Sequence, residues 1–151
     1  IETARRILAD AKGRGISILL PVDAVVAPSP DSEAAGVVPI TQIPPDLMGL
    51  DIGPATVAHF RAALPGGRTI VWNGPMGVFE KAPFAKGTVE LAKAVVDSGV
   101  FTVIGGGDTV AAVNQAGVEE KIGYVSTAGG AFLEFLEGRT LPGVAALTEK
   151  V

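Results

Sequence analysis

Apolar residues follow two patterns along this chain, a helical period and short continuous runs. Apolar residues spaced three and four apart from Ile1 to Ala11 predict an amphipathic helix that stops before Gly13 and Gly15. The run I-S-I-L-L, residues 16–20, is short, branched and nearly all apolar. It therefore predicts a buried strand that ends at Pro21.

The next segment changes from extended to irregular. Residues 22–27 predict a second extended piece, and the proline-, serine- and aspartate-rich stretch after it predicts an exposed loop. The loop returns through a short edge strand at residues 37–40. Residues 43–56 predict a connector punctuated by proline and glycine, and Pro54 suits the first turn of a helix that runs to about Leu64.

A strand, a glycine-containing turn and a helix then recur three times. The predicted strands are Thr69–Asn73, Phe101–Gly105 and Tyr124–Thr127, and the helices after them end near Ser98, Ala116 and Glu137. This alternation predicts an α/β fold with right-handed crossovers. We expect a Rossmann-like, three-layer arrangement, in which helices flank a mainly parallel sheet that is truncated at its start.

Composition narrows the class of protein. The 151 residues suit one domain, and 48% hydrophobic with 19% charged residues exclude a disordered chain. A net charge of −4 offers no basic surface for nucleic acid, and no apolar run reaches the roughly 18 residues of a membrane helix. Without cysteine or a signal peptide, the expected location is the cytoplasm. Because the chain begins inside a helical pattern and not at a methionine, we expect a piece of a longer polypeptide.

The strand-to-helix turns carry the candidate chemistry. In a parallel sheet they all lie at one edge, where backbone N–H groups and helix N-termini gather around an anionic ligand. The three turns are N-G-P-M-G (residues 73–77), G-G-G-D-T (105–109) and A-G-G-A (128–131). We expect their glycines to surround one ligand.

The central turn, residues 105–109, matches neither common nucleotide fingerprint by itself. A phosphate-binding loop of the Walker type needs a lysine, and no basic residue lies between Lys93 and Lys121. The dinucleotide fingerprint needs a further glycine where Val110 stands. A structural interpretation, in which Asp108 caps the helix and the glycines permit tight packing, stays open for these residues alone.

The stretch V-W-N-G-P-M-G-V-F-E, residues 71–80, leaves the same two interpretations open. Its glycines permit close approach of a ligand, Asn73 offers an amide at a strand end, and Glu80 offers two acceptors to ribose hydroxyls. Alternatively, Trp72 and Phe79 belong to the core, Asn73 to a turn and Glu80 to the solvated surface. For each residue alone, the structural interpretation is the commoner situation.

Taken together, six stretches resemble the phosphoglycerate kinase family in their residues and in their order along the chain. They are L-P-V-D (20–23), M-G-L-D-I-G-P (48–54), V-W-N-G-P-M-G-V-F-E (71–80), I-G-G-G-D-T (104–109), S-T-A-G-G-A-F-L-E-F-L-E-G (126–138) and L-P-G-V-A-A-L (141–147). They cover essentially the whole chain. The resemblance implies a glycolytic transferase, monomeric at full length, that moves a phosphoryl group between 1,3-bisphosphoglycerate and ADP to give ATP and 3-phosphoglycerate.

The resemblance also implies that two α/β domains bind the two substrates separately. Residues 1–151 resemble the later part of the carboxyl-terminal domain, which binds ADP or ATP with Mg²⁺. The amino-terminal domain, which holds the glycerate, is absent from this sequence. The nucleotide-binding residues that the resemblance implies are Gly49, Gly74, Met76 and Phe79 at the adenosine, Glu80 at the ribose, and Asn73, Gly105, Gly106, Gly107, Asp108 and Thr109 near the phosphates.

Two further roles follow from the resemblance. Asp108 would hold the nucleotide-bound Mg²⁺, for which one or two protein carboxylates suffice. Gly129 and Gly130 would present N–H groups to the transferring phosphoryl. Ala128 stands where the family usually has glycine, so we expect a negative φ there or a shifted turn.

Other features limit the expected activity. The basic residues Lys81, Lys86, Lys121 and Arg139 form no cluster for a glycerate phosphate, and the family's lysine-bearing G-G-A-K-V stretch does not occur. We therefore expect the isolated chain to be inactive as a kinase. Two alternatives remain open: a folded, non-catalytic fragment that associates through sheet edges, and a nicotinamide-binding oxidoreductase domain.

Overall fold

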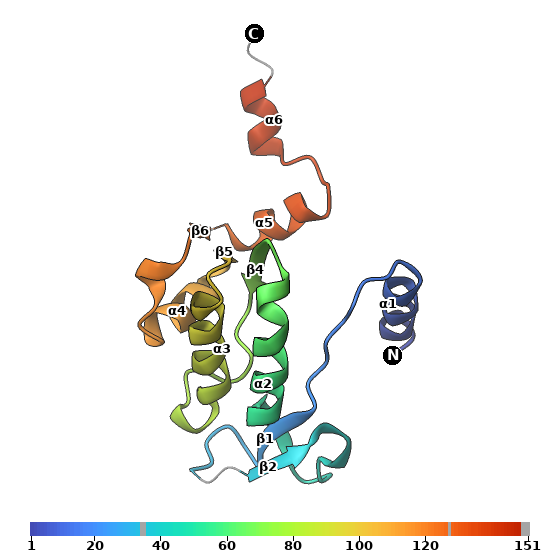
Figure 1. The fold of residues 1–151 in the computed structure, drawn as a ribbon, viewed down its shortest axis with the longest axis vertical. Helices are drawn as coiled ribbons and strands as arrows, with labels where there is room; N and C mark the ends of the chain where they lie inside the picture. Colours follow the sequence, from blue (N-terminus) through green and yellow to red (C-terminus); the bar gives the residue numbers. More distant parts are fainter. Residues whose placement is uncertain (34–35, 127, 149–151) are drawn as a thin grey trace.

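The computed structural model describes residues 1–33, 36–126 and 128–148 (Figure 1). Its helices and strands are, in chain order, α1 (Glu2–Gly13), β1 (Asp23–Ala27), β2 (Gly36–Pro39), β3 (Met48–Ile52), α2 (Pro54–Ala63), β4 (Thr69–Asn73), α3 (Lys86–Asp97), β5 (Phe101–Gly105), α4 (Gly107–Gln115), β6 (Tyr124–Ser126), α5 (Gly129–Leu136) and α6 (Pro142–Thr148). None of these helices is long and apolar enough to cross a membrane.

The parallel sheet has the order β4-β5-β6, and both strand pairs are parallel. Its main core contains Trp72 from β4, Ile104 from β5, Leu91 and Val95 from α3, and Val113 from α4. Trp72 and Ile104 are register partners and therefore share one face of the sheet, which α3 and α4 cover. The predicted α/β fold with a parallel sheet and helices is confirmed.

A second sheet precedes it and is antiparallel, with the order β2-β1-β3. The prediction of an irregular connector over residues 43–56 is wrong for residues 48–52, because Met48–Ile52 forms strand β3. The register with β1 shifts between Val25 and Val26, which is a bulge. The glycine and aspartate in M-G-L-D-I are poor strand formers, and cross-strand pairing outweighs their local preference here.

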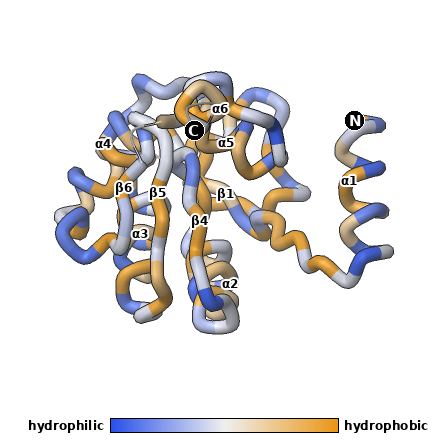
Figure 2. The backbone as a smooth tube through the Cα atoms, turned by 90° about the horizontal axis from the view of Figure 1, so that it is seen from above, coloured by the Kyte–Doolittle hydropathy of each residue, from blue (hydrophilic) through white to orange (hydrophobic). Residues whose placement is uncertain are grey.

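The predicted strand at residues 16–20 is also wrong. No described strand pairs with this run, and Ile16 and Leu20 are 49% and 56% exposed. Leu19 instead lines an apolar groove of about 380 Å³ beside β4. A parallel strand gains its stability from neighbours on both sides, which the described residues do not supply here. The predicted helix α1 forms, but it lies apart from the body beyond this extended run (Figures 1 and 2).

Two buried aspartates of the antiparallel sheet hold the N-termini of two helices. The Asp23 carboxylate accepts hydrogen bonds from the N–H groups of Ala55 (3.0 Å) and Thr56 (2.7 Å) at the start of α2. The Asp51 carboxylate accepts a 2.6 Å hydrogen bond from the N–H of Gly87 at the start of α3. Carboxylates satisfy the free N–H groups of a helix start and favour its dipole. The antiparallel sheet thereby fixes where α2 and α3 begin.

The pKa values of the two carboxyls shift in opposite directions. Burial raises the pKa of Asp23, but hydrogen bonds from Thr56 and Ala55 bring that pKa below its ordinary value overall. Burial raises the pKa of Asp51 above its ordinary value, and the hydrogen bonds from Gly87 and Ile52 offset this only in part. Side-chain space is tight around Asp51, because a Cβ added at Gly77 would lie 2.5 Å from its Oδ1.

Candidate functional site

The three glycine turns converge at the carboxyl edge of the parallel sheet. Asn73 pairs with Gly105, and Gly105 pairs with Ser126, so the ends of β4, β5 and β6 lie side by side. A Cβ built on Gly129 would lie 3.4 Å from the Cα of Gly106, so the last turn contacts the central one. The side chain of Asn73 also reaches Gly106, whose Cβ would lie 3.4 Å from Nδ2. We call this arrangement the glycine rim: residues 73–77, 105–109, 126 and 128–130.

Two positions of the glycine rim require glycine for conformational reasons. Gly74 and Gly106 both have a φ of +92°, which a residue with a Cβ rarely adopts. Gly106 is also the N-cap of α4, so the positive φ turns the chain from β5 into the helix. Helix α4 therefore begins directly after β5, and the N-terminus of a helix attracts anions through its free N–H groups.

The buried side chain of Thr109 links two of the turns by hydrogen bonds. Its hydroxyl donates a 2.7 Å hydrogen bond to the carbonyl of Gly105 and accepts a 2.7 Å hydrogen bond from the N–H of Gly74. The side chain is completely buried. A hydroxyl has only one proton to donate, so in this conformation Thr109 has none left for a phosphate oxygen.

Two candidate carboxylates have no partner among the described residues. Asp108 lies in the first turn of α4 and Glu80 lies in the turn after β4, and both are exposed. Neither makes a hydrogen bond or ion pair with another described residue. Asp108 also forms no cap hydrogen bond in α4, so the structural interpretation of Asp108 as a helix cap is wrong.

The donor set fits a metal ion that arrives with its own ligands. The described residues contain no group of three or more His, Asp or Glu side chains that could hold a metal. Mg²⁺ is commonly bound through one or two carboxylates, with waters and substrate phosphates completing its shell. A single free carboxylate at Asp108, beside N–H groups that suit phosphates, matches that requirement.

The residues expected at the adenosine are only partly brought together. Gly49 and Met76 line one pocket of about 280 Å³ between β3 and the turn after β4. Thr88, which the sequence reasoning missed, fixes this turn because its buried hydroxyl accepts a 3.1 Å hydrogen bond from the N–H of Met76. Phe79 does not line this pocket: it is 6% exposed and packs in a small cluster with Ala85 and Ala112.

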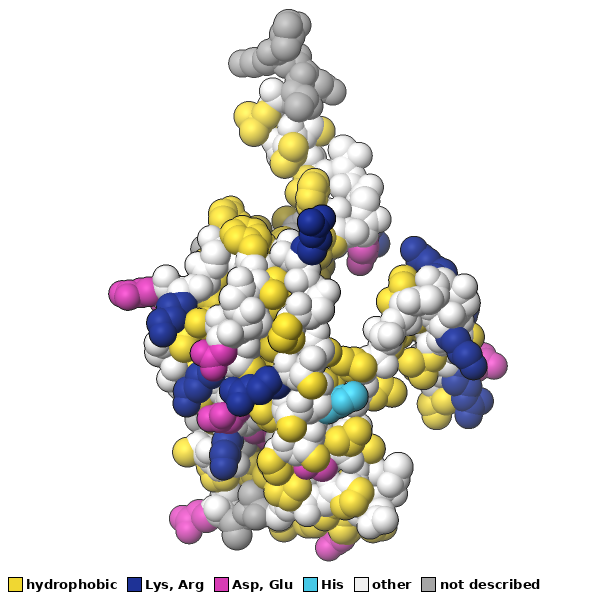
Figure 3. All heavy atoms as spheres, viewed as in Figure 1, with side chains coloured by type: hydrophobic (Ala, Val, Ile, Leu, Met, Phe, Trp, Pro, Cys, Tyr) yellow, Lys and Arg dark blue, Asp and Glu magenta, His cyan; other side chains and the backbone are white. Residues whose placement is uncertain are grey.

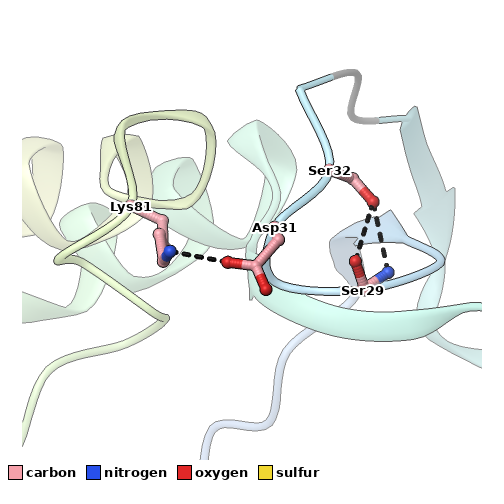
Figure 4. A network of polar contacts seen from close by, with 4 residues as sticks. All are labelled: Ser29, Asp31, Ser32 and Lys81. Carbon is pink, nitrogen blue, oxygen red and sulfur yellow. Dashed lines mark hydrogen bonds and ion pairs between the residues drawn. The ribbon is translucent and has the colours of Figure 1, made fainter.

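An ion pair anchors the turn that carries Glu80. Lys81 donates a 2.6 Å hydrogen bond to Asp31, which lies in the loop after β1 (Figure 4). The Lys81 ammonium holds the pKa of Asp31 below its ordinary value, and Asp31 raises the pKa of Lys81 in return. In the same loop, the hydroxyls of Ser29 and Ser32 lie 3.3 Å apart. The pair is exposed, so it contributes little free energy but links two distant loops.

The last turn has two features that set its shape. Ala128 has a φ of −89°, so the expected negative φ is confirmed. Phe132 packs on Gly105: a Cβ added at Gly105 would lie 2.6 Å from the ring. Helix α5, which begins with Gly129 and Gly130, is therefore seated on the end of β5 by one aromatic ring.

Comparison with known proteins agrees with this architecture. The family described as "Phosphoglycerate kinase" matches residues 1–139. The phosphoglycerate kinase of Pelotomaculum thermopropionicum is 53% identical over 151 residues, covering 99% of this chain and 38% of the relative. That of Syntrophobacter fumaroxidans is 54% identical over 150 residues, again covering 99% of this chain and 38% of the relative.

A solved structure gives the same result. The phosphoglycerate kinase of Coxiella burnetii superposes with a TM-score of 0.91 at 42% identity, over 99% of this chain and 39% of that one. The fold and the glycine rim define an α/β protein in which three glycine-containing turns meet at one edge of a parallel sheet. The chain belongs to the phosphoglycerate kinase family, a family of glycolytic transferases. It spans about 38% of the length of the relatives it matches.

Proposed function

We propose that this chain is the later part of the carboxyl-terminal domain of a phosphoglycerate kinase and binds ADP or ATP with Mg²⁺ at the glycine rim. The observation that carries the proposal is the contact between the three turns, with Gly106 lying between Asn73 and Gly129. Phosphoryl transfer requires positioning and charge neutralisation more than covalent help from the protein. A rim of backbone N–H groups with one free carboxylate meets that requirement.

Each residue of the rim has a role in this proposal. Asp108 would hold the nucleotide-bound Mg²⁺, which supplies charge neutralisation when bound. Glu80 would accept hydrogen bonds from the ribose hydroxyls, and Asn73 would donate its amide to a phosphate. Gly129 and Gly130 would present N–H groups to the transferring phosphoryl at the start of α5, where the helix dipole adds to the attraction.

The position of Thr109 changes the role that we propose for it. Because its hydroxyl proton already goes to Gly105, we assign Thr109 to positioning and not to phosphate contact. It holds the Gly74 turn against the central turn through the hydrogen bond from Gly74. Likewise, we propose that Phe79 supports the adenosine wall from the core, with Gly49 and Met76 forming the surface that contacts the ligand.

We propose that the isolated chain has no kinase turnover. It covers 38% of the length of its relatives, and the remaining part would bind 3-phosphoglycerate or 1,3-bisphosphoglycerate. The pocket that Gly49 and Met76 line contains no Lys or Arg among its described residues. An assay that couples ATP formation from 1,3-bisphosphoglycerate to an indicator enzyme should give no rate above the blank, and a normal turnover number would refute this proposal. The cytoplasmic location and the monomeric state of the full-length protein remain predictions.

Calorimetric titration tests the binding proposal. Mg-ADP should bind saturably and NADH should not, and chelation of Mg²⁺ should weaken ADP binding. Asp108→Asn should remove most of the Mg²⁺ dependence of ADP binding. Glu80→Gln should weaken ADP binding without changing its Mg²⁺ dependence. Glu119→Gln, an exposed carboxylate on a turn distant from the rim, is the matched control. Silence toward both ligands would favour the non-catalytic fragment, and preference for NADH would favour the oxidoreductase alternative.

A further inference from the structure

A further cavity lies on the side of the antiparallel sheet that faces α2 and α3. Its volume is about 600 Å³, within the range typical of small-molecule sites. Strands β1, β2 and β3 contribute one wall, and the two helices contribute the others. The lining residues are Val25, Val37, Ile52, Pro54, Val57, Ala58, Arg61, Ala62, Lys86, Gly87 and Glu90.

The chemistry of this cavity is apolar with a few charged groups. Valine, isoleucine, proline and alanine side chains form most of the lining, and Lys86, Arg61 and Glu90 are the charged residues among the described ones that line it. Over α2 and α3, basic and acidic side chains stand among apolar ones (Figure 3). Such a site would bury the apolar body of a ligand and leave one polar end to a charged side chain.

The charges of the lining favour an anionic head group. Glu90 is engaged by Lys93 at 3.5 Å, and Arg61 makes only a loose ion pair with Asp97 at 3.9 Å. Lys86 makes no hydrogen bond or ion pair with another described residue. The cavity therefore offers one free ammonium and one weakly held guanidinium, while its carboxylate is already paired.

This cavity is separate from the glycine rim. None of the residues assigned to nucleotide, metal or phosphoryl contact lines it. Asp51 fills the space between the two regions from β3, where its carboxylate is held by the N–H of Gly87. A ligand in the cavity would not occupy the proposed nucleotide position.

We propose that the cavity binds an apolar monocarboxylate of the size of a medium-chain fatty acid. Its hydrocarbon chain lies against Val25, Ile52 and Val57, and its carboxylate pairs with Lys86, with Arg61 as the second cation. The hydrocarbon supplies most of the binding free energy, and the head group sets the preference for an anion over a cation.

Titration of the ¹⁵N-labelled chain with dodecanoate, below its micelle concentration, tests the proposal. Saturable amide shifts are expected in residues 57–62 and 86–90. Ala62→Trp should fill the cavity and weaken binding at least about tenfold, because the apolar contact area is lost. Lys86→Met keeps the apolar stem and should weaken binding roughly two- to fivefold, the range of an exposed ion pair. Lys12→Met, on the distant helix α1, is the matched control.

Three results would overturn the proposal. The first is that dodecanoate shows no saturable binding below roughly 1 mM, which corresponds to a binding free energy of about −4 kcal/mol. The second is that dodecyltrimethylammonium binds as tightly as dodecanoate. The third is that the amide shifts are confined to the groove beside β4 that Leu19 and Trp72 line. Ala62→Leu provides a smaller filling of the same cavity, and a far-ultraviolet spectrum shows whether each variant folds. Mg-ADP should leave the dodecanoate affinity unchanged, so this proposal stands or fails independently of the nucleotide site.

Discussion

The N–H of Gly74 donates a 2.7 Å hydrogen bond to the hydroxyl of Thr109, a residue 35 positions further along the chain. The same hydroxyl donates to Gly105, so one buried side chain ties together the turns after β4 and β5. The turn of Gly74 has a positive φ and no other described hydrogen bond through its N–H. The geometry of the glycine rim therefore depends on the buried hydroxyl of Thr109.

Thr109→Val should loosen this link while keeping the shape of the side chain. The substitution leaves the N–H of Gly74 and the carbonyl of Gly105 without their partner, and we expect a loss of about 1–3 kcal/mol in the free energy of unfolding. Nucleotide affinity should fall with it. Urea unfolding followed by the fluorescence of Trp72, the single tryptophan, measures the first effect. Thr109→Ser, which keeps the hydroxyl, should retain most of the stability; an equal loss in both variants would contradict the bridging role.

The ionised carboxylate of Asp23 should stabilise the fold at pH values above the pKa of an unfolded aspartate. Its pKa is lowered in the folded state, so its contribution is present above the unfolded pKa and is lost as the pH falls through the folded one. Asp23→Asn should therefore lower the free energy of unfolding at pH 7, by about 1–2 kcal/mol for the lost helix cap. The difference from the native chain should shrink toward pH 3. A difference that is constant with pH would show that the charge of Asp23 is not involved.

Asp51 should have the opposite pH dependence. Burial raises its pKa, so the folded state binds the proton more tightly than the unfolded state. Stability from this group declines as the pH rises from the unfolded pKa through the folded one. Relative to Asp51→Asn, the free energy of unfolding of the native chain should fall as the pH rises through this range. Urea unfolding at a series of pH values measures the difference. A gain over the same range would contradict the raised pKa.

Phe132 should determine how firmly α5 is seated. Its ring packs on Gly105, whereas Phe135 on the same helix is 65% exposed. Phe132→Ser should speed hydrogen exchange of amides 132–137 by at least about tenfold, because little else described holds this short helix. The matched variant Phe135→Ser should leave exchange unchanged. Similar exchange in both variants would mean that α5 is held by other contacts.

The sequence predicted the second half of the fold well because each unit there is locally self-consistent. Thr69–Asn73 and Phe101–Gly105 are apolar, branched runs bounded by glycine, and both form strands with the predicted ends. Residues 16–20 have the same local character and form no strand, since pairing depends on neighbours that the local sequence does not specify. Strand β3 was missed for the converse reason, because its pairing with β1 overrides weak local preference.

The candidate site was predictable as a position but not in its details. Glycines after parallel strands place the turns at one edge, whatever their side chains. Whether a hydroxyl such as Thr109 faces a ligand or a neighbouring backbone depends on packing between distant segments. The burial of Phe79 depends likewise on its packing against Ala85, just before α3, and Ala112 of α4. Neither outcome has a signal in the local sequence.

Paramagnetic broadening by Mn²⁺ tests the central claim most directly, since Mn²⁺ can replace Mg²⁺ beside a nucleotide and broadens nearby amide signals. With Mn-ADP added to the ¹⁵N-labelled chain, we predict that amides of all three turns broaden together: residues 73–74, 105–109 and 128–130. Amides 58–62 of α2 should stay sharp, and Asp108→Asn should reduce the broadening. Broadening of one turn alone, or broadening centred away from Asp108, would contradict a single nucleotide site at the glycine rim.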